Sequence, residues 1–462
     1  MEPGTTSWHL KPDVIAAHEF WLLSLRPITG SEHMWKRPEK PIAIHTSQVV
    51  VGLYVWLDMS WDDHPFLYNR FKINDAKQIA TIRAIPIQGK LYYYPEKSSA
   101  APGPVLDQPE TVTPEDTEAP FASNEAAELA QEMMQQNKEK HDRLRQQKDA
   151  AARADRAWEQ AARVTREAML GMARSPKQAG AQLAELSKKT ASMISQGQEI
   201  LLHLLGDKEG DGPQFHALNV MTLAMLLGKV AGLNETQLSE LALGTLAHDI
   251  GKAKVPAHIL KAKTRAKHEE AFFRQHGAYG VEMAKVSDAF GLTALSIIAD
   301  HHEYIDGSGW PTGKTNAGPA ARIVALVDRY DRLCSPESPE REALMPAEAL
   351  ARIFRVETAR FDPRLLSMLI KLLGVYPPGT LVKLNDESLG LVVSPGKESL
   401  RPTVLIYSPE DDKRDAPTVD LGQVSELKIE EALRPSSIPS DVLQWLNPRQ
   451  RLSYFFSTDK SS

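Results

Sequence analysis

Apolar side chains recur at helical spacing through the middle of the chain and at strand-like spacing near its ends. The runs Val220–Val230, Leu238–Ala247 and Leu292–Ala299 repeat apolar residues at the spacing of packed helices. Val49–Val55 and Leu91–Tyr94 are rich in strand-forming residues. The pattern predicts a multidomain, mainly α chain. Its parts are a small α/β module over residues 1–98 and an all-helical bundle over residues 201–374.

The periodicity changes again towards the C-terminus. Thr380–Leu384, Gly390–Val393 and Thr403–Tyr407 are strand-like runs separated by turn residues, which is typical of a small β meander. We therefore expect a β-rich subdomain and tail over residues 375–462.

Two segments join the N-terminal module to the bundle. Residues 99–122 are rich in Pro, Glu, Asp and Thr and cannot bury a core, so we interpret them as a disordered linker. Residues 123–200 predict a long helical connector, in which Pro176 separates a first helix from a second run over Ala179–Leu205. The apolar positions of the first helix are too sparse for a heptad seam, so a solvated signalling helix and a dimer contact both remain open.

Composition narrows the class of protein. The 462 residues carry a net charge of -6, which argues against DNA as a partner, and include one cysteine, Cys334, which excludes an internal disulfide. The sequence contains no run of eighteen apolar residues, so we expect no membrane span and a cytoplasmic location. Any metal site must use nitrogen and oxygen ligands.

The helical region concentrates such ligands. His248 and Asp249 are adjacent, so an imidazole and a carboxylate can bind one metal together, and Lys252 follows one helical turn later. The other candidate ligands in helix-like segments are His216, His276, His301, His302 and Asp328. Five histidines and two aspartates between residues 216 and 328 predict a metal centre in the core of the bundle.

This ordered set resembles the HD-GYP family, bacterial phosphodiesterases of the HD superfamily that hydrolyse cyclic di-GMP. The residues that carry the resemblance are His216, His248-Asp249-Ile250-Gly251-Lys252, His276, His301-His302-Glu303, Asp306-Gly307-Ser308-Gly309-Trp310-Pro311 and Asp328 with Asp331. The resemblance covers roughly residues 201–407. The segment over residues 47–98 looks like the uncharacterised domain that often precedes HD-GYP domains.

The resemblance implies a two-metal phosphodiesterase. By this likeness His216, His248, Asp249 and Asp328 hold one ion, and Asp249, His276, His301 and His302 hold the other. Asp249 then bridges the two ions, and a hydroxide held between them attacks the phosphodiester. Lys252 offsets phosphate charge, and Asp331 orients a ligand or Lys252. The substrate-binding residues would be Lys252, Tyr304, Asp306, Gly307, Gly309, Trp310 and Pro311.

Several positions depart from the family pattern. Tyr304 stands where an arginine or lysine usually follows His-His-Glu, which removes a cation that could bind phosphate. We therefore expect weak activity, and Tyr304→Arg should improve it. Trp310 replaces the tyrosine of the family name, and the segment over residues 312–321 looks short. Some members carry a glutamate for a third metal where this chain has Gly212, so we expect two ions.

Two functions from different classes remain. The leading one is hydrolysis of cyclic di-GMP to linear pGpG, with further cleavage to GMP left open. The alternative is a weak or inactive sensor that binds cyclic di-GMP or a signalling partner. A third interpretation, a nucleotidase for another nucleotide, fits the Gly-Ser-Gly-Trp-Pro loop less well. The ligand types suit iron or manganese, which the family often uses, and are compatible with nickel, cobalt or zinc.

Overall fold

A computed structural model describes two compact units, one over Met34–Ala150 and one made of Met1–His33 with Ala151–Ser462. The described residues are 41–59, 64, 66, 69–85, 87, 91–105, 135, 156–196, 200–204, 212–337, 342–407, 418–424, 427–446 and 454–458. The predicted linker beyond residue 105 and most of the long helix lie outside them. Among the described helices, none has both the length and the apolar character that a membrane span requires.

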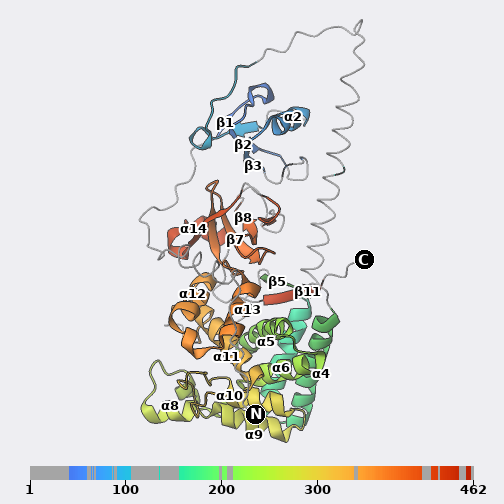
Figure 1. The fold of residues 1–462 in the computed structure, drawn as a ribbon, viewed down its shortest axis with the longest axis vertical. Coiled ribbons are helices and arrows are strands. Elements are labelled where there is room, and N and C mark those ends of the chain that lie inside the picture. Colours follow the sequence, from blue (N-terminus) through green and yellow to red (C-terminus); the bar gives the residue numbers. More distant parts are fainter. Residues whose placement is uncertain are drawn as a thin grey trace, which may run out of the picture. The chain divides into compact units, whose positions relative to one another are not determined.

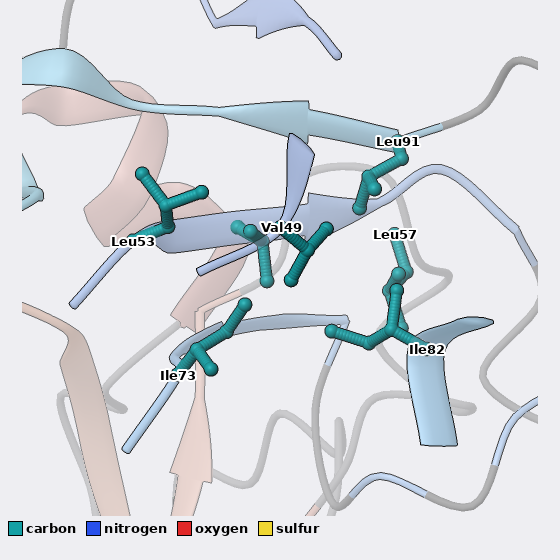
Figure 2. Close-up of a cluster of buried hydrophobic side chains, with 7 residues drawn as sticks. Val49, Leu53, Leu57, Ile73, Ile82 and Leu91 are labelled. Atoms are coloured by element: carbon teal, nitrogen blue, oxygen red, sulfur yellow. The ribbon is translucent and has the colours of Figure 1, made fainter. Parts of the chain in front are cut away.

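The N-terminal unit is a small antiparallel sheet with a helix. The strand order is β1 (Ile42–Ala43), β4 (Leu91–Tyr93), β2 (Tyr54–Leu57) and β3 (Arg70–Lys72), and α2 (Ala76–Ala84) follows β3. Figure 2 shows the side chains that meet in its core, which are Val49, Leu53, Leu57, Ile73, Ile82 and Leu91, with Val55 completing the cluster. Apolar burial therefore holds this unit together.

The strand predicted over Val49–Val55 begins later than expected. Strand β2 starts at Tyr54, because Gly52 has a φ of 98° and sits in a turn that only glycine adopts readily. The residues before it still contribute Val49 and Leu53 to the core. The predicted strand is therefore present only from Tyr54 onward.

The second unit is the predicted helical bundle. Its helices are α4 (Pro176–Gln196), α5 (Pro213–Val230), α6 (Glu235–Ala247), η4 (Ile250–Lys254), α7 (Ala257–Leu260), α8 (Lys267–Phe273), α9 (His276–Val286), α10 (Leu292–Asp300), α11 (Pro319–Cys334), α12 (Pro346–Val356) and α13 (Pro363–Leu373). Helix α6 packs against α4, α5 and α10, and α11 packs on α5 (Figure 1). Asn234 caps α6 through its side chain. The centre of the bundle is thus built around α5 and α6.

The second helical run of the connector ends earlier than predicted. Helix α4 stops at Gln196, and Ile200–Leu204 forms strand β5, which pairs antiparallel with β11 (Tyr454–Thr458). This pairing joins segments about 250 residues apart, so the local apolar pattern could not distinguish the strand from a helix. Within the first predicted helix, residues 156–171 are described and are helical.

The C-terminal sheet confirms the three predicted strands and adds two. Its order is β10 (Ile429–Leu433), β6 (Leu381–Leu384), β7 (Leu389–Ser394), β8 (Thr403–Ile406) and β9 (Thr418–Asp420), all antiparallel. Strand β10 returns to pair with β6, so the sheet is a meander with its last strand added at the opposite edge. The helix α14 (Ser440–Leu446) follows.

Candidate metal centre

Five elements bring the predicted ligands together. His216 lies in the first turn of α5, His248 and Asp249 follow α6, and His276 begins α9. His301 and His302 follow α10, and Asp328 lies in α11. The ligand atoms form two groups, and in each group they lie within 4.8 Å of one another. The set of residues that we call the carboxylate group, after Asp328, consists of His216, His248 and Asp328. The set that we call the histidine-rich group consists of Asp249, His276, His301 and His302.

Asp249 faces both groups with different oxygens. Its Oδ1 lies 3.3 Å from His276 Nε2 and 3.8 Å from His301 Nε2. Its Oδ2 lies 3.4 Å from His248 Nε2 and 3.9 Å from His216 Nε2. One buried carboxylate therefore serves the two groups at once, as a bridging ligand must.

Hydrogen bonds fix the ring orientation of four histidines. Nδ1 donates to a main-chain carbonyl oxygen in three of them: His248 to Thr245 (2.6 Å), His276 to Phe273 (2.8 Å) and His301 to Ile298 (3.0 Å). A carbonyl can only accept, so each of these rings carries its proton on Nδ1 and turns Nε2 to the centre. The fourth, His216, donates from Nδ1 to Asp331 Oδ2 (2.7 Å), and Asn219 also donates to Asp331.

The histidine-rich group fits a cation. Nε2 of His276 and Nε2 of His301 are 3.3 Å apart, although both rings have their proton on Nδ1. Two lone pairs at this distance repel each other unless a positive charge lies between or beside them. Asp249 Oδ1 is also buried, and no described residue donates a hydrogen bond to it. A divalent metal would satisfy all three atoms.

The protonation of the two groups differs. Burial and the neighbouring His248 hold the pKa of His301 well below its ordinary value, and burial with His301 does the same for His302. Burial would also lower the pKa of His248, but Asp249 and Asp328 raise it to about 9. His301 and His302 are therefore neutral and ready to bind, whereas His248 carries a proton that a metal would displace.

Gly251 explains how the turn after α6 reaches α9. A Cβ at this position would lie 1.8 Å from the His276 carbonyl oxygen and 2.4 Å from Gly280 N. No other residue fits at that separation. The glycine therefore lets the backbone that carries Asp249 approach the helix that carries His276.

Sequence reasoning missed two residues at the edge of the centre, Arg332 and Glu337. Arg332 Nε donates to both oxygens of Asp328 (2.8 and 3.0 Å), and its Nη2 donates to Asp249 Oδ2 (2.7 Å). Lys252 Nζ donates to the same Asp249 oxygen (2.7 Å). Burial would raise the pKa of Asp249, but Lys252, His248 and Arg332 outweigh it and hold that pKa well below its usual range.

The predicted substrate loop is fastened to the histidine pair. Trp310 N donates to the His302 carbonyl, and the Trp310 ring stacks on the His302 ring with centroids 3.9 Å apart. Glu303 Oε1 accepts from Thr312 N and Oγ1. A Cβ at Gly309 would lie 2.4 Å from Tyr304 N, so this residue must be glycine. The loop therefore supports His302 directly.

The remaining predicted substrate contacts are the other loop residues Asp306, Gly307 and Pro311, and Tyr304 just before the loop. Asp306 accepts from Ser308 N and Oγ and is exposed, as is Pro311, while Gly307 has a φ of 79°. Tyr304 points to Phe361, with ring centroids 5.4 Å apart, and the Arg360 guanidinium lies 5.4 Å from its ring. Tyr304 thus packs against the segment that contains Arg360 and Phe361.

A helical bundle that converges histidines and aspartates from facing helices in this way defines an HD-type domain, and comparison with protein families agrees. Residues 160–365 match the family described as HD domain, and residues 42–182 match a domain of unknown function, DUF3391. An HD domain preceded by this uncharacterised domain is the arrangement that the sequence resemblance predicted.

Known relatives share this region. A cyclic di-GMP phosphodiesterase of Pseudomonas aeruginosa is 29% identical over 253 residues, which are 53% of this chain and 61% of the relative. A 3'3'-cGAMP-specific phosphodiesterase of Vibrio cholerae is 29% identical over 163 residues, 34% of this chain and 30% of the relative. Among solved structures, a HDG"Y"P protein from Bdellovibrio bacteriovorus has a TM-score of 0.39 at 15% identity, covering 71% of this chain and 97% of that one. The chain spans less than two thirds of these two curated relatives.

Proposed function

We propose that this protein is a metal-dependent phosphodiesterase that hydrolyses cyclic di-GMP to linear pGpG, with any GMP arising from a second cleavage. The observation that carries the proposal is Asp249, whose two oxygens face two separate groups of metal-binding atoms. Two ions that share a carboxylate are suited to in-line attack on a phosphodiester. The names of several relatives, cyclic di-GMP phosphodiesterases, support the substrate.

The chain's own residues would prepare the centre for this chemistry. Divalent cations, which we propose to be iron or manganese, would supply Lewis acidity and activate the attacking water. Carbonyl oxygens hold the Nδ1 proton of His276 and His301 and so keep Nε2 free to bind. Asp331 orients His216 in the same way, and Lys252 offsets negative charge beside Asp249.

A sensor that binds the cyclic dinucleotide without cleaving it is the second candidate. It is favoured by Tyr304, which packs against Phe361 and brings no cation to the loop after Glu303. A sensor of this kind would still bind cyclic di-GMP through its remaining cations but would not hydrolyse it.

Product analysis distinguishes these candidates. Manganese-loaded protein would be incubated separately with cyclic di-GMP, 3'3'-cGAMP and pGpG, and the products separated by chromatography. We expect pGpG from cyclic di-GMP at the highest rate. Binding of cyclic di-GMP without any linear product would establish the sensor, and faster cleavage of 3'3'-cGAMP would refute the proposed substrate.

We also propose a cytoplasmic signalling role in which the N-terminal unit receives a partner or signal and the helix over residues 123–174 forms a homodimer contact. Deleting residues 123–150 should then convert a dimer to a monomer in sedimentation velocity. If the number of chains per sedimenting particle is unchanged by the deletion, the helix is a spacer.

A further inference from the structure

Two cations at the edge of the metal centre converge on one carboxylate oxygen. Lys252 Nζ donates to Glu337 Oε1 at 2.5 Å, and Arg332 Nη1 donates to the same oxygen. The side chains of Lys252 and Arg332 are each 16% exposed, whereas Glu337 is 48% exposed. The two cations are thus mostly buried, whereas the anion that they bind is half exposed.

The two cations also contact the metal-binding carboxylates. Both reach Asp249 Oδ2 at 2.7 Å, and Arg332 adds two hydrogen bonds to Asp328. If Asp249 and Asp328 bound metal ions through these oxygens, the contacts to Lys252 and Arg332 would weaken. Glu337 is then the partner that both side chains keep among the described residues. A lysine and an arginine that converge on one oxygen beside a candidate metal centre are suited to bind a phosphate oxygen.

We propose that Arg332 and Lys252 together bind the substrate phosphate and that Glu337 occupies the phosphate position until substrate displaces it. This inference rests on the proposed function, because it assigns the anion as a phosphodiester. The new elements are Arg332 as a phosphate-binding residue and Glu337 as a competing internal anion. Arg332 also supplies, from α11, the charge that Tyr304 does not supply from the loop.

The position of Glu337 makes displacement feasible. It lies three residues beyond Cys334, the last residue of α11, and its side chain is half exposed. Its Oε1 accepts both hydrogen bonds, whereas a phosphodiester offers two non-bridging oxygens to the same donors. The Nη1 group of Arg332 can then donate a charge-assisted hydrogen bond to one of these phosphate oxygens. A phosphodiester can therefore take the place of the Glu337 carboxylate at these donors.

The test measures equilibrium binding in manganese-loaded protein by calorimetry, with pGpG and inorganic phosphate as the probes. Arg332→Ala should weaken binding of both probes roughly tenfold to hundredfold, since one charge-assisted hydrogen bond is lost. Glu337→Gln should strengthen it, because the competing charge is removed. Arg322→Ala, which removes an arginine of the same helix that pairs with Asp362, should leave both affinities unchanged.

Metal content, measured on the same samples, separates binding from support of the ligands. If Arg332→Ala loses metal, and the protein that remains loaded binds phosphate normally, Arg332 only positions Asp249 and Asp328, and the proposal is wrong. Unchanged or weaker binding in Glu337→Gln also overturns it. Should Arg332→Ala fail to fold, the affinity of Glu337→Gln for the two probes still decides the proposal, because the Glu337 side chain is exposed.

The outcomes also separate this inference from the proposed function. If the wild type binds inorganic phosphate through Arg332 but releases no product from cyclic di-GMP, the phosphodiesterase proposal fails and the phosphate site stands. If cyclic di-GMP is hydrolysed and Arg332→Ala has wild-type affinity for both probes, the phosphodiesterase proposal stands and the phosphate site at Arg332 fails.

Discussion

The two donor groups share Asp249 but meet different surroundings. On the histidine-rich side, no described lysine or arginine donates to Asp249 Oδ1, and that oxygen is buried without a hydrogen-bond partner. On the carboxylate side, Lys252 and Arg332 both donate to Oδ2, and Arg332 also binds Asp328. Among the described residues, the histidine-rich side therefore receives no hydrogen bond from a lysine or arginine, whereas the other side receives them from two such cations.

This difference indicates an order of filling. In the histidine-rich group His301 and His302 are neutral, the orientations of His276 and His301 are fixed and Asp249 Oδ1 is unsatisfied, so the group is preorganised for an ion. The carboxylate group must first exchange the arginine for a metal and release the proton of His248. We therefore expect the histidine-rich group to bind its metal more tightly than the carboxylate group does.

The largest expected effect comes from His276→Ala. Without this ligand, the histidine-rich group should lose its ion, and hydrolysis should fall by at least about 100-fold, more than the 10–100-fold typical of losing a ligand's hydrogen-bonding partner. The measurements are metal content by mass spectrometry and initial rates with cyclic di-GMP. His268→Ala, on the exposed surface of α8, is the matched control. Full metal content in His276→Ala would contradict the claim that the histidine-rich group binds its metal more tightly.

Asp331→Ala should affect only the carboxylate group. The His216 ring would lose the acceptor of its Nδ1 proton, so affinity for the weaker metal should fall roughly tenfold to hundredfold. A manganese titration of the variant should retain one tight site and weaken the other. Equal weakening of both sites would show that the groups are not independent.

Glu357→Gln tests support of α11 from outside the centre. Arg329, beside Asp328, donates two hydrogen bonds of 2.7 Å to this buried carboxylate, so we expect urea unfolding to show a loss of about 1.5–3 kcal/mol. Burial opposes ionisation of Glu357, but the bond from Arg329 outweighs it and lowers its pKa. The stabilisation is therefore present above the unfolded-state pKa of about 4.3 and is lost as pH falls through the folded-state pKa. The variant and wild type should converge in acid, and a constant difference would be inconsistent.

Tyr304→Arg should have the smallest effect on activity. The sequence alone favours a gain, but the side chain packs on Phe361 beside Arg360, where a second guanidinium would be repelled. We therefore expect a lower melting temperature and no increase in the specificity constant towards cyclic di-GMP. An increase would mean that the arginine reaches the phosphate by leaving this packing.

The sequence predicted best what local pattern and motif can carry. Helices α5, α6 and α10 followed from apolar spacing, and the seven predicted ligands gather in the two donor groups because each lies at a defined position of a helix. Arg332 and Glu337 could not be predicted in this way. Arg332 bonds to Asp249 across 83 residues, and Glu337 bonds to Lys252 across 85. Only the folded bundle brings those charges together, as it does strands β5 and β11.

The shared carboxylate is the central claim, and metal stoichiometry in Asp249→Ala tests it most directly. Wild type and variant would be loaded with manganese, freed of excess metal and analysed for bound metal and for hydrolysis of cyclic di-GMP, with the exposed Asp288→Ala as the control. We predict two ions per chain in the wild type and the control, and loss of metal from both sites together with loss of hydrolysis in Asp249→Ala. Retention of one fully occupied site, or of normal turnover, would contradict a bridge between two metals.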